Sequence, residues 1–358
     1  MSNEQLISQT TRHTVYVQRF AGFLSNQFNP FAEQMRKDIA VAIISAGQII
    51  TAKQTSDLIR EIREIQLDAY EQYNGILTDE FREFSINEAE FELKSLDNVI
   101  ESNAIVLDLP ADNQVWAAVK ANPLVFTDTN DVVILNTYMK GIEAKEIKRI
   151  SDIIRTGIVT GQTTEQIVSS ISGKGGAIDS TVKNNIRTMV RTSTNHVSNI
   201  ARLKTMSDND DIVIGYELVV TFDGRTSQIC RSYGQADKVY KPTDKFRPVP
   251  PFHPNCRTSM VAVLDERYRI DNSDATKASK GDEGGQQIAA DETYYSWLKK
   301  QSKAFQDDAL GPTRGQLMRN GGLTSKQFGA LNVDQLFRPL NLKEMKAKNP
   351  LAFEKAGL

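Results

Sequence analysis

Residues 221–230 read TFDGRTSQIC, and residues 248–258 read PVPPFHPNCRT. These two segments hold Cys230 and Cys256, the two cysteines of the 358-residue chain, together with His253, one of its three histidines. Thiolate and imidazole groups are the ligands that suit zinc and related soft metal ions. Their concentration in one short part of the chain indicates a local structural or chemical role.

The sequence around these side chains predicts a strand, a turn and a rigid return path. Residues 216–221 (YELVVT) alternate in the way of a half-buried strand, and the Asp-Gly pair that follows is a turn signal. The four prolines of the second segment restrict its backbone to extended conformations. We therefore expect residues 221–258 to form one compact unit in which Cys230 approaches the second segment.

The length, composition and charge of the chain limit the classes of protein to which it can belong. A chain of 358 residues exceeds one ordinary core, so two or three domains are expected. Hydrophobic residues at 40% and charged residues at 25% are typical of a soluble globular protein. The net charge of -2 argues against a dedicated nucleic-acid binder, although a local patch could still contact DNA.

No apolar run reaches the ~18 residues of a membrane span, and no signal peptide is recognisable. Two cysteines exclude a disulfide scaffold and suit a reducing cytosol.

Helical periodicity dominates the rest of the chain, so the sequence predicts an α+β fold that is predominantly helical. Residues 1–135 are predicted to form an N-terminal long-helix region. Residues 136–268 are predicted to form a small mixed α/β module that carries the proline-rich Cys/His loop. Residues 269–290, with almost no apolar content, are predicted to be a flexible linker. Residues 291–358 are predicted to form a helical C-terminal tail module whose aromatic residues fold back or dock on a partner.

Within the long-helix region, one apolar stripe keeps helical spacing and is expected to face a core. Its members are Leu58, Ile62, Ile65, Ala69, Tyr73 and Ile76. A second helix over residues 79–101 can supply the opposing face in a helical hairpin. Further along, Thr163 and Gln166 predict a capping box at the start of another helix.

The order of these motifs resembles the phage Mu F-like family of minor head proteins, also called head morphogenesis proteins. An Arg-Thr helix with a downstream Asn is matched by Arg191, Thr192 and Asn195. The remaining motif positions are Asp223, Arg225, Thr226, Cys230, Pro251, His253, Cys256 and Arg257. The core of the resemblance covers about residues 140–265, and the aromatic segment from Thr293 looks like an extension of many tailed-phage members.

The resemblance implies a minor head (capsid) protein of a tailed bacteriophage, which associates with the portal vertex and acts in head morphogenesis. It also implies a role in DNA packaging or ejection, with the portal protein and other head or neck proteins as partners and contact with packaged DNA. Its place would be the virion, after assembly in the host cytoplasm. We expect residues 1–135 to supply the main contacts with other virion proteins.

The Cys/His segments leave several interpretations open. Cys230, His253 and Cys256 are candidate zinc ligands. Many members of the family carry further cysteines where this chain has Ser227 and Thr258, and a closed structural zinc site prefers four ligands. Asp223 or water would then complete the site. The alternatives are two buried thiols packed against the proline-rich loop, or a disulfide.

Catalysis is the competing class of function. A cysteine and a histidine could act as nucleophile and base, and an arginine could bind an anion, as in a hydrolase or transferase carried in the phage head. However, no glycine-rich oxyanion turn lies beside Cys256, and Pro254 follows His253 directly. The pair Asp223 and Arg225 can equally be an ion pair across a hairpin. We therefore expect a virion structural protein without catalytic residues.

Overall fold

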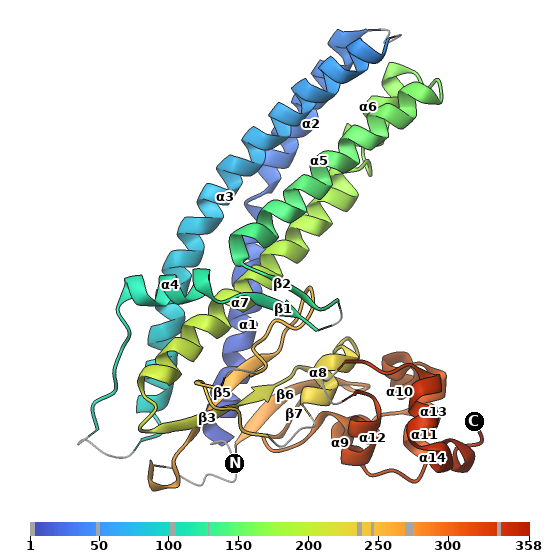
Figure 1. Ribbon diagram of the computed structural model, residues 1–358. Helices are drawn as coiled ribbons and strands as arrows, with labels where there is room; N and C mark the ends of the chain where they lie inside the picture. Colours follow the sequence, from blue (N-terminus) through green and yellow to red (C-terminus); the bar gives the residue numbers. More distant parts are fainter. Residues whose placement is uncertain are drawn as a thin grey trace. The chain divides into compact units, whose positions relative to one another are not determined.

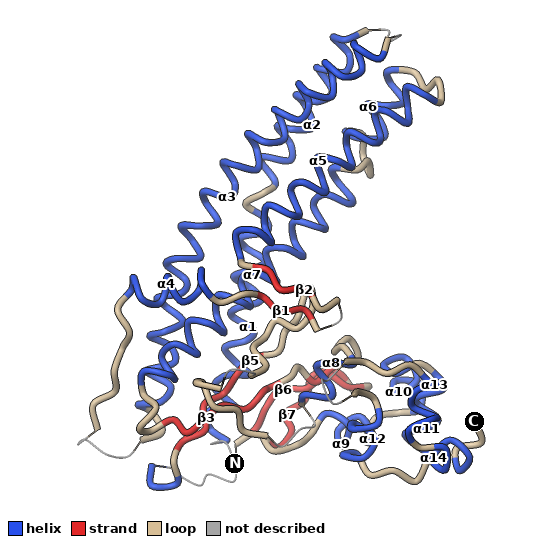
Figure 2. Tube along the Cα trace, viewed as in Figure 1, coloured by secondary structure: helices blue, strands red, loops and turns tan. Residues whose placement is uncertain are grey.

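The computed structural model describes most of the chain (Figure 1). The described residues are 4–47, 51–100, 105–127, 129–234, 238–244, 247–268, 275–334 and 338–358. Helices dominate this part of the chain and short strands accompany them (Figure 2), so the predicted α+β, predominantly helical class is confirmed. None of the helices in these ranges is long and apolar enough to cross a membrane.

The chain forms two compact units. The mixed unit comprises Met1–Val17, Ser85–Val132 and Asn195–Leu358, and the helical unit comprises Gln18–Phe84 and Val133–Thr194. Both units are discontinuous in sequence, unlike the four contiguous segments predicted above. The reason is that three long helices, α1 (Glu4–Asn26), α3 (Ala52–Asp97) and α7 (Lys183–Asp208), contribute residues to both.

Local sequence signals place the other elements of the helical unit. They are α2 (Asn29–Ala46), α5 (Leu135–Val159), α6 (Thr164–Ser172) and the π-helical turn η1 (Ile178–Val182). Helix α2 has a proline in its first turn and ends at Gly47, whose φ of 62° suits glycine. Helix α6 begins with the predicted capping box of Thr163 and Gln166, and it lies beside α2 and α5 (Figure 1).

Helix α3 is uninterrupted over 46 residues, so the predicted hairpin between residues 55–76 and 79–101 is wrong. Gly75 lies inside it, where an added Cβ would meet no atom within 4 Å. An exposed glycine weakens a helix by only about 1 kcal/mol, which is too little to break one that packs along its length. The predicted stripe is buried at four positions, but Ile65 is half-buried and Ile76 is 37% exposed.

The mixed unit contains the short sheets. Strand β3 (Val213–Val219) pairs antiparallel with β5 (Ser259–Leu264). Strand β4 (Phe222–Asp223) pairs parallel with β6 (Thr276–Gly281), which pairs antiparallel with β7 (Gly284–Ala289). The other elements between residues 105 and 268 are α4 (Asp112–Ala121), β1 (Leu124–Phe126), β2 (Asp131–Val133), α8 (Gln228–Tyr233) and the 3-10 turn η2 (Glu266–Tyr268). All residues of β5 are buried, which matches its apolar sequence.

The prediction of a flexible linker over residues 269–290 is wrong for residues 276–289, which form the β6–β7 hairpin. Residues 269–274 lie outside the described ones. The polar composition suggested a linker, but backbone hydrogen bonds between the strands and one buried lysine stabilise this hairpin. The Nζ atom of Lys277 donates to the Glu292 carbonyl at 2.5 Å and lies 4.4 Å from the centre of the Phe222 ring.

The tail is helical and, as predicted, folds back, packing on the strands within the mixed unit. Its helices are α9 (Tyr294–Lys299), α10 (Lys303–Leu310), α11 (Pro312–Asn320), α12 (Ser325–Leu331), α13 (Leu342–Lys348) and α14 (Pro350–Lys355). Tyr294, Tyr295 and Trp297 are almost fully buried, and Trp297 packs 5.6 Å from Phe222 between ring centres. The tail and the strands therefore share one hydrophobic core.

Candidate functional site

The first half of the site is the turn that leads from β4 into α8. The Thr226 hydroxyl donates to the Thr221 carbonyl at 2.5 Å, which closes the turn. The Ser227 hydroxyl then caps α8 by accepting from the backbone N–H of Cys230 at 3.3 Å. This cap fixes Cys230 in the first turn of the helix, with its side chain buried.

The second half is the loop that precedes β5. The peptide bond between Pro250 and Pro251 is cis, and Pro251 is buried. The backbone N–H of Cys256 donates to the His253 carbonyl at 3.1 Å. Asn255 between them has a φ of 59°, a left-handed conformation that asparagine tolerates better than most residues. This tight turn brings the side chains of His253 and Cys256 to the same side.

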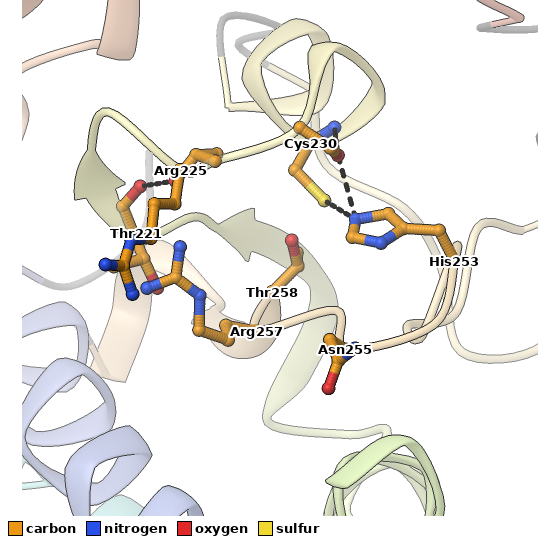
Figure 3. Close-up of a pocket in the computed structure, with 9 residues that line it drawn as sticks. Thr221, Arg225, Cys230, His253, Asn255, Arg257 and Thr258 are labelled. Carbon is orange, nitrogen blue, oxygen red and sulfur yellow. Dashed lines mark hydrogen bonds between the residues drawn. The ribbon is translucent and has the colours of Figure 1, made fainter. Parts of the chain in front are cut away.

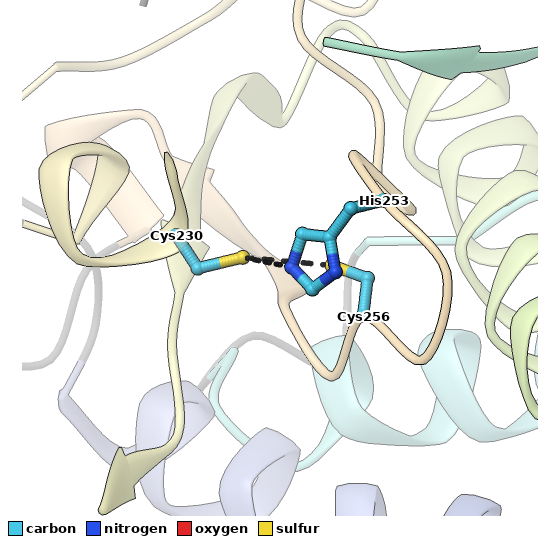
Figure 4. A group of neighbouring side chains, drawn as sticks. All are labelled: Cys230, His253 and Cys256. Atoms are coloured by element: carbon cyan, nitrogen blue, oxygen red, sulfur yellow. Dashed lines mark hydrogen bonds between the residues drawn. The ribbon is translucent and has the colours of Figure 1, made fainter. Parts of the chain in front are cut away.

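The two halves bring the three candidate ligands together (Figure 4). The Cys230 sulfur lies 3.2 Å from Nε2 of His253 and 3.6 Å from the Cys256 sulfur. All three ligand atoms lie within 4.8 Å of one another. The sulfurs are too far apart for a bond of about 2.05 Å, so both cysteines are free thiols and the disulfide interpretation does not describe this structure.

Hydrogen bonding sets the tautomer of His253. Its Nδ1 atom lies 2.8 Å from the Pro254 carbonyl, which can only accept, so Nδ1 carries the proton. The lone pair of Nε2 then points toward Cys230 at 3.2 Å and toward the Ser227 hydroxyl at 2.8 Å. The imidazole is therefore oriented as an acceptor or a ligand.

The two thiols differ in acidity. Burial raises the pKa of the Cys230 thiol, and the neighbouring Cys256 sulfur raises it further. Burial also opposes ionisation of Cys256, but the hydrogen bond from the Cys230 thiol and the nearby His253 ring lower its pKa overall. The cluster thus favours one thiolate, on Cys256, beside the neutral Cys230 thiol.

An ion pair stands beside the cluster. Arg257 donates to both carboxylate oxygens of Asp223, at 2.6 and 2.8 Å. Thr226 and the backbone N–H of Arg225 donate to the same carboxylate, at 3.1 and 3.0 Å. The predicted pairing of Asp223 with Arg225 is wrong, because the loop brings Arg257 to the carboxylate and the side chain of Arg225 is exposed.

The site encloses very little space. A cavity of about 20 Å³ is lined by Ser227, Cys230, His253 and Thr258, together with Thr221, Arg225, Thr226, Asn255 and Arg257 (Figure 3). About one water molecule fits a space of this size. The site can therefore accommodate a water or a metal ion, but it has no room for a substrate.

Residues 148–261 match the model of the family described as Phage Mu protein F like protein. The predicted family resemblance is confirmed over this segment. It runs from the middle of α5 to the middle of β5 and includes every motif residue discussed above. No curated protein and no solved structure matches the chain. Similarity to this family implies a phage head morphogenesis protein located in the virion, with other head proteins as partners.

Helix α7 supports the site of the Mu F-like segment from behind. The amide of Asn195 donates to the Thr258 carbonyl at 3.1 Å, and Asn199 accepts from the backbone N–H of Met260 at 3.2 Å. These bonds anchor the end of the Cys/His loop and the start of β5 to the helix. Arg191 precedes Asn195 by one helical turn and belongs to the helical unit.

A buried ion pair that was not predicted from the sequence continues this support. Arg202 donates to Glu92 at 2.6 Å, to Ser259 at 2.9 Å and to Thr10 at 3.0 Å, and both charged side chains are at most 2% exposed. The available signal was the spacing of Asn195, Asn199 and Arg202, which places three polar side chains on one face of α7.

Proposed function

We propose that this chain is a minor head protein that associates with the portal vertex of a tailed bacteriophage and acts there in head morphogenesis. The match of residues 148–261 to the Mu F-like family carries the proposal, because the matched segment contains the whole Cys/His site and the Asp223–Arg257 pair. The site supports a structural role, since its side chains bind one another and tie α8, the loop and β5 together.

The geometry does not favour the competing hydrolase or transferase. A thiol nucleophile must reach an electrophilic carbon or phosphorus of a substrate, and Cys230 and Cys256 are only 3% and 1% exposed. The adjoining cavity of about 20 Å³ holds no more than about one water molecule. The same close packing suits side chains whose role is to fix α8 against the loop that precedes β5.

The helical unit offers a surface for contact with other head proteins. Val41 and Ile44 lie on α2, and each is 61% exposed, whereas their neighbours Ala42 and Ile43 are buried. Single exposed apolar side chains are common, but neighbouring ones form a patch of the kind that protein partners cover. We infer that this face of α2 contributes to docking in the head.

Co-expression with the portal, scaffolding and capsid proteins of the same phage tests the proposal. We expect the chain in procapsids in few copies, and its absence from particles assembled without the portal protein. The double variant Val41→Asp and Ile44→Asp should fold normally and be depleted from procapsids. Val106→Asp is the matched control, because Val106 is 86% exposed in the mixed unit. Equal incorporation with and without the portal protein would contradict portal association.

Contact with packaged DNA is the second part of the proposal. Because the chain has a net charge of -2, this contact would involve a local patch and would weaken steeply with salt. Crosslinking in filled heads, compared with empty procapsids, measures it. Crosslinks to protein alone in both particles would remove DNA from the list of partners.

A further inference from the structure

We propose that Cys230, His253 and Cys256 bind one zinc ion through three protein ligands, with a water molecule in the fourth position. The ion would fasten α8 to the loop that precedes β5. The proposal does not depend on portal association, since it rests on the geometry of the three side chains alone.

Two of the three ligand separations are close to those of a tetrahedral zinc site. With Zn–S bonds of about 2.3 Å and Zn–N bonds of about 2.05 Å, two sulfur ligands lie about 3.8 Å apart, and a sulfur and a nitrogen about 3.6 Å apart. The corresponding separations here are 3.6 Å between the Cys230 and Cys256 sulfurs and 3.2 Å between the Cys230 sulfur and Nε2 of His253. For these two pairs, an ion would require shifts of only a few tenths of an ångström. The third pair, the Cys256 sulfur and the His253 ring, lies within 4.8 Å and would have to close further around the ion.

The histidine is already oriented as a ligand. Metal-binding histidines almost always donate the second ring N–H to a carbonyl or a carboxylate, which fixes the tautomer and the ring plane. The Pro254 carbonyl has this role for Nδ1 of His253, at 2.8 Å. The lone pair on Nε2 points into the cluster, where both sulfurs lie.

The fourth position has its own space and polar neighbours. The cavity of about 20 Å³ borders Cys230 and His253, and the side chains of Ser227 and Thr258 also line it. The Ser227 hydroxyl lies 2.8 Å from Nε2 of His253, so it can bind the water that completes the coordination. Two thiolates and an imidazole favour zinc over magnesium, calcium or manganese, which prefer oxygen ligands.

Metal analysis of the full chain, purified under reducing conditions without chelators, tests the proposal. We expect about one zinc ion per chain. Loading with Co²⁺ should give a thiolate-to-cobalt charge-transfer band and the intense visible bands of tetrahedral cobalt. This spectrum needs no variant, so it remains informative if the substitutions below prevent folding. Neither zinc nor a cobalt spectrum after incubation with excess metal would overturn the proposal.

Variants identify the ligands. Cys230→Ser and Cys256→Ser should each lose the bound zinc and the charge-transfer band. Ser227→Cys should bind zinc more tightly, because a thiolate would replace water at the fourth position. Asn255→Gly is the matched control, since glycine keeps the φ of 59° in the same turn without removing a ligand, and it should retain the ion. Zinc retained in both serine variants, or a disulfide between the cysteines in freshly isolated protein, would also overturn the proposal.

Discussion

Replacing Asp223 by Asn should destabilise the mixed unit more than any comparable change at a surface ion pair. Asparagine keeps the size of the side chain but removes its charge. The carboxylate accepts two bonds from Arg257, at 2.6 and 2.8 Å, and further bonds from Thr226 and the backbone of Arg225. Its side chain is 16% exposed and that of Arg257 is 28% exposed, so water screens the pair only in part.

The magnitude follows from the kind of bond that is lost. A hydrogen bond to a charged group contributes about 1.5–3 kcal/mol, and a neutral one about 0.5–1.5 kcal/mol. Asp223→Asn weakens both bonds with Arg257 without abolishing the others, so we expect a loss of about 2 kcal/mol in the free energy of unfolding. In a double-mutant cycle with Arg257→Met, the coupling energy should be about 1–2 kcal/mol.

Urea unfolding followed by tryptophan fluorescence measures this loss. Both tryptophans, Trp116 and Trp297, belong to the mixed unit, so the signal reports the unfolding of that unit. Asp265→Asn is the matched control, because its partner Arg267 is 69% exposed and the change should be small. A coupling energy near zero between Asp223 and Arg257 would refute the reasoning.

The pH dependence gives a second, independent check. Burial acts to raise the pKa of Asp223, but the hydrogen bonds and charge of Arg257 lower it overall. A carboxyl group whose pKa is lower in the folded state stabilises the fold fully above its unfolded pKa of about 4. This contribution is lost as the pH falls through the folded value. The difference between the wild type and Asp223→Asn should therefore shrink below about pH 4.

Three further changes have expected outcomes. Burial lowers the pKa of His196 to about 4, so its ring resonances should not titrate between pH 7 and 5 in NMR spectra; a midpoint near 6.5 would contradict this. Arg202→Met should cost about 3–5 kcal/mol in urea unfolding because it leaves Glu92 buried without its partner, and adding Glu92→Leu should recover part of the loss. Trp297→Ala should cost about 3–5 kcal/mol in the same assay, whereas Leu351→Ala, at a side chain 67% exposed, should cost little.

The Cys/His site could be predicted from the sequence because its determinants are local. Prolines fix the path of residues 248–254, and His253 and Cys256 are three residues apart, so one turn brings them together. The partner of Asp223 could not be predicted in this way. Arg225 is nearer in sequence, but its side chain is exposed. Arg257 reaches the carboxylate because the loop before β5 packs against the turn that carries Asp223.

The division of the chain into two units could not be predicted from the sequence for a related reason. Glu92 and Arg202 are 110 residues apart, and their pairing depends on how α3 and α7 pack rather than on any local pattern. The hairpin of residues 276–289 could not be predicted for a different reason. Its strands carry few apolar side chains, and backbone hydrogen bonds between the strands stabilise it. Composition alone cannot distinguish such a hairpin from a linker.

The tail matters to the site although it lies outside the matched segment of residues 148–261. The Tyr294 hydroxyl donates to the Asp223 carbonyl at 2.7 Å, and the Arg231 guanidinium on α8 lies 5.4 Å from the centre of the Tyr294 ring. Tyr294 is fully buried, so its hydrogen bond to the Asp223 carbonyl is costly to leave unmade. The turn that carries Asp223 is thus held by Arg257 on one side and by the tail on the other. A substitution in the tail would therefore alter the positions of Asp223 and α8, and through them the Cys/His cluster, without replacing any of the three ligands.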